Sequence, residues 1–263
     1  MFSSFQFQIF LPLAIPDTSW NSNDWSIISN IVHAFEAFSS VNEIRRQIEL
    51  TTNTASNLPF GLTQSYQILS SFSNSLRLFI SSIPDFQVLP PSEQCSLLQR
   101  NLFGLFAFGG VYLMGQSGIF DSTENTMALQ PLYGLEMIER IQRLYIQLDS
   151  DSILIKILLI ALAFSSNSYT NAPRGDSFLS GTFRLFGSQN IYVELLWKYL
   201  IHRYEYQSSV ERFSSLIQRI LHALTLTMEI YQSNPVFQSF IDQLEQSLLV
   251  NDPTGILPLW GKT

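Results

Sequence analysis

The chain has 263 residues, of which only 13% are charged, and its formal net charge at pH 7 is −7. A surface that binds nucleic acid needs a stripe of Lys and Arg that displaces counterions, so this charge balance argues against one. The 21 Phe, 10 Tyr and 4 Trp residues supply ample apolar area, which argues against a disordered chain. Cys95 is the only cysteine, which excludes an intramolecular disulfide and a cysteine-based zinc finger.

Helical periodicity runs through almost the whole chain. Asn23 or Asp24 is expected to cap a helix that begins near Trp25 and carries an apolar face from Ile27 to Phe38. Further helices are predicted at residues 41–50, 62–83, from 92 onward, and at 131–148, 149–164, 191–206, 210–232 and 236–250. Loops are predicted at residues 51–59, 165–187 and 251–255. The sequence therefore predicts about nine helices around one core, with no internal repeat.

Residues 102–120 carry no charge over nearly the length of a membrane span. Several glycines lie within this stretch, so we expect a buried helix that ends in a glycine-rich turn, with a membrane-inserted helix as the alternative. Its second half, residues 111–120, is predicted to form a short β-hairpin around the turn from Gly115 to Gly118. Residues 1–15 are also apolar, but they lack a basic region and contain Pro12, so no signal peptide is predicted.

The motifs of common enzymes and metal sites are missing from the sequence. It has no Gly-x-Ser-x-Gly segment, no glycine loop followed by Lys that would cradle a phosphate, and no His-Glu-x-x-His. His33 with Glu36, and His202 with Glu205, each offer two ligands on one helix face, whereas zinc takes three or four from a protein. We therefore expect no enzyme, no metal and no cofactor.

Residues 79–98 read FISSIPDFQVLPPSEQCSLL. This segment resembles the signature of nuclear-receptor ligand-binding domains, which runs from the end of helix 3 into helix 4. The family shows an aromatic residue, then Ile-Pro-x-Phe, then Leu-x-x-x-Asp/Glu-Gln-x-x-Leu-Leu, and the spacing here matches without a gap. The rest of the chain keeps the family's order, so that the resemblance covers roughly residues 22–260. Weaker matches lie at residues 24–38 for helix 1, 148–159 for helix 8, 193–204 for helix 9, 212–217 for helix 10, and 257–260 for the approach to the activation helix.

The resemblance implies an all-α, three-layer helical sandwich at residues 22–263, preceded by an N-terminal extension at residues 1–21. It places a ligand pocket between helix 3 and helix 5, lined by Ile68, Leu69, Phe72, Leu102, Phe103, Phe106, Ala107 and Gly110. Members of the family that bind acids carry an Arg near the end of helix 5, and the matching position here is about Leu113. A ligand is therefore expected to be neutral and lipid-like, because a carboxylate buried without a partner is costly. The alternative is that the phenylalanines fill the cavity themselves.

Two further surfaces follow from the resemblance. The family forms dimers through helix 10–11, which implies a dimerisation face here; the alternative is that its apolar members pack inward. The family's coactivator groove clamps a short helix between two Lys and a Glu. Ser81 and Gln99 stand at the two Lys positions, with Arg100 adjacent, and no Glu follows near the chain end. Coregulator binding through this clamp is therefore not expected. The residues of the dimerisation face would be Leu216, Arg219, Ile220, Ala223 and Leu224.

The resemblance thus implies a nuclear protein that regulates transcription, with the cytoplasm as the alternative location. It would bind an apolar small molecule, form a homodimer or heterodimer with nuclear receptors, or both. The family's DNA-binding domain needs eight cysteines, so this chain is expected not to bind DNA by that route, and it would act as a silent or dominant-negative partner. A gene whose upstream part encodes that domain is an open alternative. Another is a ligand-independent helical interaction protein with a filled pocket.

Overall fold

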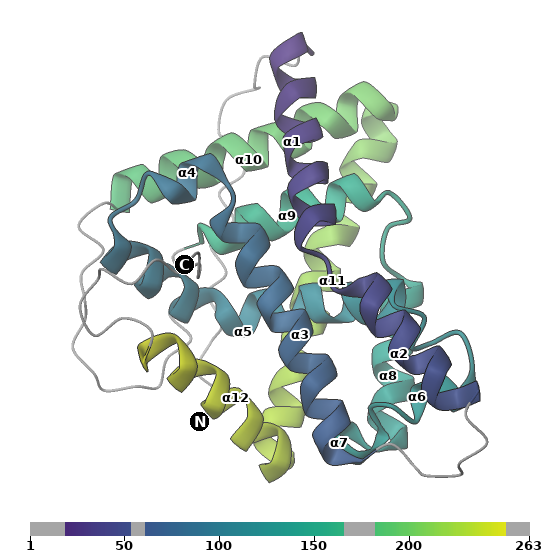
Figure 1. The fold of residues 1–263 in the computed structure, drawn as a ribbon. Coiled ribbons are helices and arrows are strands. Elements are labelled where there is room, and N and C mark those ends of the chain that lie inside the picture. The colour runs from purple at the N-terminus through teal and green to yellow at the C-terminus, as the bar shows by residue number, and fades with distance from the viewer. Residues whose placement is uncertain (1–18, 54–60, 166–181, 251–263) are drawn as a thin grey trace.

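The computed structural model describes residues 19–53, 61–165 and 182–250. Every regular element within these ranges is a helix, which confirms the predicted all-α class (Figure 1). The helices are α1 (Ser22–Phe38), α2 (Val41–Asn53), α3 (Leu62–Ser81), α4 (Pro84–Gln87), α5 (Pro91–Gln116), α6 (Thr123–Thr126), α7 (Gln130–Tyr133), α8 (Leu135–Ile146), α9 (Ser152–Ala163), α10 (Thr182–Arg203), α11 (Tyr206–Ser233) and α12 (Pro235–Val250). The three helices of a single turn, α4, α6 and α7, account for the excess over the nine predicted.

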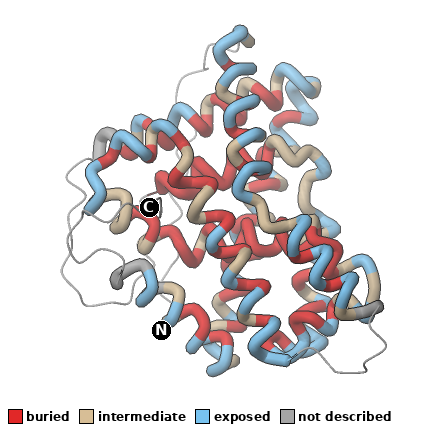
Figure 2. Tube along the Cα trace, viewed as in Figure 1, coloured by how far each residue is buried: buried red, intermediate tan, exposed pale blue. Residues whose placement is uncertain are grey.

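Helices α5 and α9 form the centre of the molecule (Figure 2). Nearly every residue of α5 from Leu97 to Gly115 is buried, and so is almost all of α9. A helix that is apolar on all sides must be covered on all sides. Accordingly, α5 packs against α2, α3, α8, α9, α11 and α12, while α9 packs against α1, α5 and α10. The other long helices bury apolar residues against this pair or against one another, while the short helices α4, α6 and α7 pack on neighbouring helices instead.

The segment at residues 79–98 forms the junction between α3 and α5. Phe79, Phe86 and Leu97 are almost completely buried there. Pro84 is the first residue of α4, a position at which a missing N–H costs nothing. The side-chain amide of Gln94 donates to the carbonyl of Leu89 at 2.8 Å, which holds the turn before α5. The residues that resemble the receptor signature therefore form a partly buried connection between α3 and α5.

Asn101 ties α5 to the end of α9. Its side chain is buried, and its Nδ2 donates to the carbonyls of Ala163 and Ser165 at 3.0 Å each. The Oγ of Ser165 donates back to its Oδ1 at 2.8 Å. The last carbonyls of a helix lack partners within the helix, and a buried carbonyl without a partner is costly. The side-chain amide of Asn101 thus supplies hydrogen-bond donors to carbonyls at the buried C-terminal end of α9.

The predicted hairpin at residues 111–120 is wrong. Residues 111–116 are the last turns of α5, and residues 117–120 form a turn with a positive φ of 79° at Gly118. This stretch is buried nearly throughout, and a helix satisfies its own backbone hydrogen bonds without a partner strand. The loop predicted at residues 165–187 also ends too late, because α10 already begins at Thr182 and Leu185 is buried in the core.

Among the described helices, none is both long enough and apolar enough to cross a membrane. The residues matched to the approach to the activation helix, 257–260, and the predicted extension, 1–21, lie wholly or largely outside the described ranges.

Gly109 permits the close approach of α3, α5 and α9. A Cβ at this position would lie 2.7 Å from Cδ2 of Leu76 and 3.0 Å from Cδ2 of Leu159, both of which are buried. We expect Gly109→Ala to lower the free energy of unfolding by about 1–3 kcal/mol, because overpacking shifts both leucines. Gly104→Ala is the control: its Cβ would meet Leu224 at an ordinary 3.8 Å, and alanine favours the helix by about 1 kcal/mol. Urea unfolding followed by circular dichroism measures both, and equal effects of the two variants would contradict this account.

Candidate functional site

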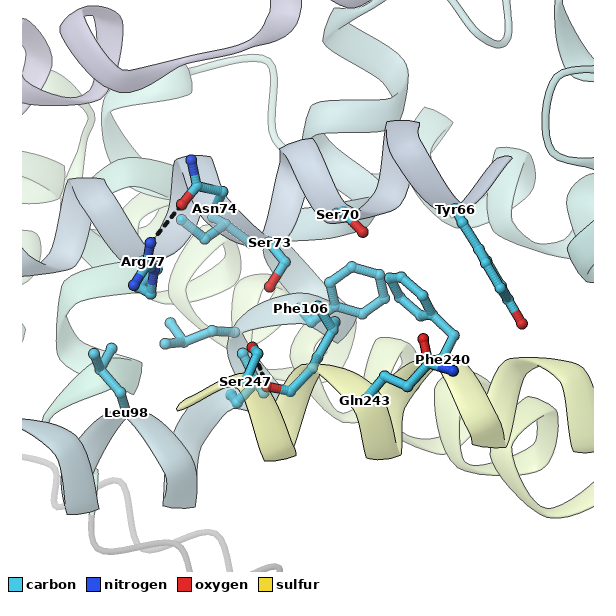
Figure 3. Close-up of a pocket in the computed structure, with 14 residues that line it drawn as sticks. Tyr66, Ser70, Ser73, Asn74, Arg77, Leu98, Phe106, Phe240, Gln243 and Ser247 are labelled. Atoms are coloured by element: carbon cyan, nitrogen blue, oxygen red, sulfur yellow. Dashed lines mark hydrogen bonds between the residues drawn. The ribbon is translucent and has the colours of Figure 1, made fainter. Parts of the chain in front are cut away.

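A cavity of the described chain lies between α3, α5 and α12 (Figure 3). Its volume is about 390 Å³, which lies within the range of small-molecule sites. It is partly open to solvent rather than sealed in the core. We call it the α3–α5–α12 cleft. The residues that line it are Tyr66, Ser70, Ser73, Asn74, Leu76 and Arg77 of α3, Leu98, Leu102, Leu105 and Phe106 of α5, and Phe240, Gln243, Leu244 and Ser247 of α12.

One wall of the cleft is apolar. Leu98, Leu102, Leu105 and Phe106 recur at helical spacing, so they lie on one face of α5. At one end, the ring of Phe240 stacks on Tyr66 with a centroid distance of 5.3 Å and lies 5.9 Å from Phe106. This wall offers a continuous surface to an alkyl or ring-containing ligand.

The opposite wall is polar. Ser70, Ser73, Asn74 and Arg77 follow one another along the flank of α3. The guanidinium of Arg77 donates to Oδ1 of Asn74 at 2.7 Å. Burial lowers the pKa of Arg77 from its usual value, but an arginine still carries its charge at neutral pH. None of the described residues that line the cleft is acidic.

Helix α12 forms the third wall, and Asn234 sets where that helix begins. The Oδ1 of Asn234 accepts hydrogen bonds from the amides of Val236 and Phe237 at 3.0 and 3.1 Å. Its Nδ2 donates to the carbonyl of Leu132 at 2.6 Å. Asparagine caps a helix in this way because its side chain pairs the free amides of the first turn, and Pro235 fits the first helical position. These bonds fix α12 against α7 and across the cleft.

Two of the eight residues predicted to bind a ligand, Leu102 and Phe106, line the cleft. The other six are buried in the core around it: Ile68, Leu69, Phe72, Phe103, Ala107 and Gly110. Phe72 has no exposed surface at all. The periodicity of α3 shows which residues face inward, but it does not show that α12 covers them.

The cleft also contains residues that the sequence reasoning missed. Arg77, Ser73 and Asn74 were overlooked because the apolar face of α3 dominates its pattern. The available signal was the polar spacing of Ser70, Asn74 and Arg77 along the flank of that face. Gln243 and Ser247 on α12 carry no comparable signal, since their position depends on where α12 packs.

The residues of the predicted coactivator groove differ in how far they are buried. Ser81 is buried at the end of α3, and its hydroxyl has no hydrogen-bond partner within the described structure. Gln99 and Arg100 are half-buried on α5. Ser81 therefore offers no surface contact to a partner helix.

The predicted dimerisation residues lie mostly inside the chain. Leu216, Ile220, Ala223 and Leu224 are buried, as the inward-packing alternative expected. Arg219 is half-buried, and its Nη1 donates to Oε1 of Gln147 at 2.6 Å. The exposed apolar residues of α11 are instead Tyr206, Val210 and Leu221. A dimer through α11 stays a prediction, and these side chains are the ones it would use.

Phe237 of helix α12 packs against Phe106, one of the residues that the resemblance assigned to the ligand pocket. Phe237 is fully buried, and its ring lies 6.4 Å from Phe106 and 5.3 Å from Tyr133. We expect Phe237→Ala to lower the free energy of unfolding by about 3–5 kcal/mol, because it opens a cavity. Val236→Ala, at a side chain 37% exposed, should cost about 0.5 kcal/mol or less. Urea unfolding measures the difference, and a small cost at Phe237 would mean that α12 does not pack as described.

In the described part of the chain, no three His, Cys, Asp or Glu residues gather as a set of metal ligands. No model of a known protein family matches the sequence, and no curated protein matches it as a relative. The likeness to nuclear receptors therefore rests on the residues of this chain.

Proposed function

We propose that this chain is a ligand-binding module of the nuclear-receptor type, which regulates transcription by binding an apolar small molecule in the α3–α5–α12 cleft. The observation that carries the proposal is the segment at residues 79–98. Its signature-like residues form the α3–α5 junction, and the cleft opens between those same two helices. A three-layer sandwich and residence in the nucleus belong to this proposal.

Ligand binding and the docking of α12 are coupled in this arrangement. A ligand in the cleft contacts Phe240, Leu244 and Ser247 only while α12 is in place. A ligand shifts an equilibrium by its difference in affinity for the two states. A ligand in the cleft therefore favours the state in which α12 packs against α3 and α5. The surface around α12 differs between this state and one in which α12 is detached. That surface is the element through which a ligand would regulate a partner.

In the family, two Lys side chains clamp the coactivator. The matching residues here, Ser81 and Gln99, are both uncharged, and Ser81 is also buried. We therefore propose that the module acts through a dimer with other receptors, as a silent or dominant-negative partner. A pull-down with purified receptor ligand-binding domains tests this step. Capture that Leu221→Glu abolishes would support it, and no capture of any receptor domain would contradict it.

Native mass spectrometry of the purified chain tests the ligand. We expect a small-molecule mass that is retained on the native protein and lost on denaturation. Leu102→Trp should prevent retention, because the larger side chain occupies the cleft. Leu135→Trp, at an exposed position on α8, is the matched control and should retain the mass. Circular dichroism must show that both variants fold, since overpacking costs about 1–3 kcal/mol.

A second candidate function is a ligand-independent interaction protein. It is favoured by the six predicted pocket residues that lie in the packed core, with Phe72 fully buried. In this case native spectra would show the bare polypeptide, before and after incubation with mixed lipids, while receptor capture persists. These two results together would contradict the ligand-binding proposal and support the ligand-independent interaction protein.

A further inference from the structure

A second hollow lies on a different part of the surface from the α3–α5–α12 cleft. It runs between α11 and residues 147–151, which connect α8 to α9, and its volume is about 410 Å³. It is more open to solvent than the cleft, and we call it the α11 groove. Its lining includes Gln147, Leu148 and Ser150 of the connection and Ser215, Leu216 and Arg219 of α11.

The residues that α11 contributes lie on one face of the helix. Arg212, Ser215, Leu216 and Arg219 follow one another at intervals of three or four residues or their sum, and such positions are neighbours on a helix. Leu216 is buried, whereas Ser215 and Arg219 are half-buried. The hydroxyl of Ser215 therefore stands one turn before the guanidinium of Arg219, at the edge of the groove.

The charge of Arg212 is already matched inside the protein. Its Nη1 donates to Oδ2 of Asp149 at 2.6 Å, and its guanidinium lies over the ring of Tyr204 at 4.0 Å. Only 9% of the Asp149 side chain is exposed, so the carboxylate is held in place. This end of the groove is electrically neutral and closed by a formed ion pair.

The charge of Arg219 is not matched in the described part of the chain. Its Nη1 donates to Oε1 of Gln147 at 2.6 Å, which is a neutral partner, and no ion pair of the described residues includes Arg219. Its Nε is buried and has no acceptor among the described residues. Because an unmet buried donor costs about 1–3 kcal/mol, this guanidinium gains from an anionic acceptor placed beside it.

Two hydroxyl groups add donors around Arg219. Ser150 is exposed in the connection and Ser215 is half-buried on α11, and neither hydroxyl has a hydrogen-bond partner among the described residues. The acidic residue of α11 in the groove, Glu211, lies eight residues before Arg219 and accepts from Nε2 of Gln207 at 3.0 Å. That separation is about 12 Å along the helix axis, over which salt screens exposed charges.

Three separate donor groups on two sides of the groove suit a phosphate group. Phosphate offers at least three strong acceptor oxygens, whereas a carboxylate offers two. Hydrogen bonds between a guanidinium and such an oxygen are charge-assisted and therefore stronger than bonds between neutral groups. We infer that the α11 groove binds a small oxyanion, either the phosphate ion or the phosphate group of a small molecule, through Arg219, Ser150 and Ser215. The groove shares no lining residue with the α3–α5–α12 cleft, so this inference is independent of the proposed function.

Isothermal titration calorimetry on the full chain tests the oxyanion. The probes are inorganic phosphate, methyl phosphate and acetate, each titrated at pH 7 with the ionic strength held constant by sodium chloride. We expect both phosphates to bind saturably and acetate to bind at least about fivefold more weakly, since it offers fewer acceptor oxygens. Inorganic phosphate and methyl phosphate distinguish the free ion from a phosphate carried by a small molecule.

Variants assign the binding to Arg219. Arg219→Gln should weaken phosphate binding at least about tenfold, because it removes a charge-assisted hydrogen bond. Arg219→Lys should retain part of the affinity, since it keeps the charge but not the planar fork. Ser150→Ala and Ser215→Ala should each weaken binding by a smaller factor. Arg143→Gln is the matched control and should bind as the unaltered chain does, because Arg143 lies on α8 outside the groove with 69% of its side chain exposed.

Circular dichroism checks that each variant folds, since Arg219→Gln also removes the bond to Gln147. If that variant does not fold, Arg219→Lys and Ser215→Ala carry the assignment. No saturable phosphate binding by the folded chain, equal affinity for acetate and phosphate, or full affinity in every folded variant of the groove would overturn the inference. Each of these results would leave the proposal for the α3–α5–α12 cleft unaffected.

Discussion

The structure depends on one constraint: helix α5 is apolar around most of its circumference beyond Asn101 and must be covered there on nearly all sides. Most of its residues from Leu97 to Gly115 are buried, so little of its surface is left for water. Helices α2, α3, α8, α9, α11 and α12 pack on it, and Gly109 lets α3 and α9 come close enough to do so. Hydrophobic burial on this scale determines the overall arrangement, because no other helix in the described ranges combines such length with so little polar surface.

The candidate site is a consequence of how α3 and α12 cover this helix. The apolar face of α3, with Leu69 and Phe72, packs toward α5, and that fixes the rotation of α3 about its own axis. The rotation in turn brings the neighbouring polar flank, with Ser73 and Arg77, to the edge of the contact. Helix α12 then closes the cleft from the other side. One face of α3 therefore packs in the core, and the flank beside it lines the cleft.

The sequence predicted much of this arrangement and missed parts of it for specific reasons. Periodicity placed most of the long helices, since each buries one stripe of apolar residues. It put the start of α10 too late, and it failed at residues 111–120, where glycines between apolar residues resemble a hairpin. There the glycines make room for close packing: a Cβ at Gly115 would overlap the ring of Tyr145. The apolar stripe of α11 suits either a dimer contact or the chain's own core. The pattern alone therefore did not show that Leu216 and Ile220 face the chain's own core.

By itself, the sequence determined the helical class, the burial of the uncharged stretch that begins at residue 102 and the connection at residues 79–98. These features follow from local spacing, which is fixed by the 3.6-residue repeat and by prolines at helix starts. Only the tertiary structure decided that α12 packs its phenylalanines against Phe106, and that Arg77 faces a cleft rather than open water. Contacts between α3 and α12 join residues about 170 positions apart, as in the bond from the hydroxyl of Tyr66 to the carbonyl of Val236. No local pattern contains information about a contact at that distance, because it depends on how every intervening helix packs.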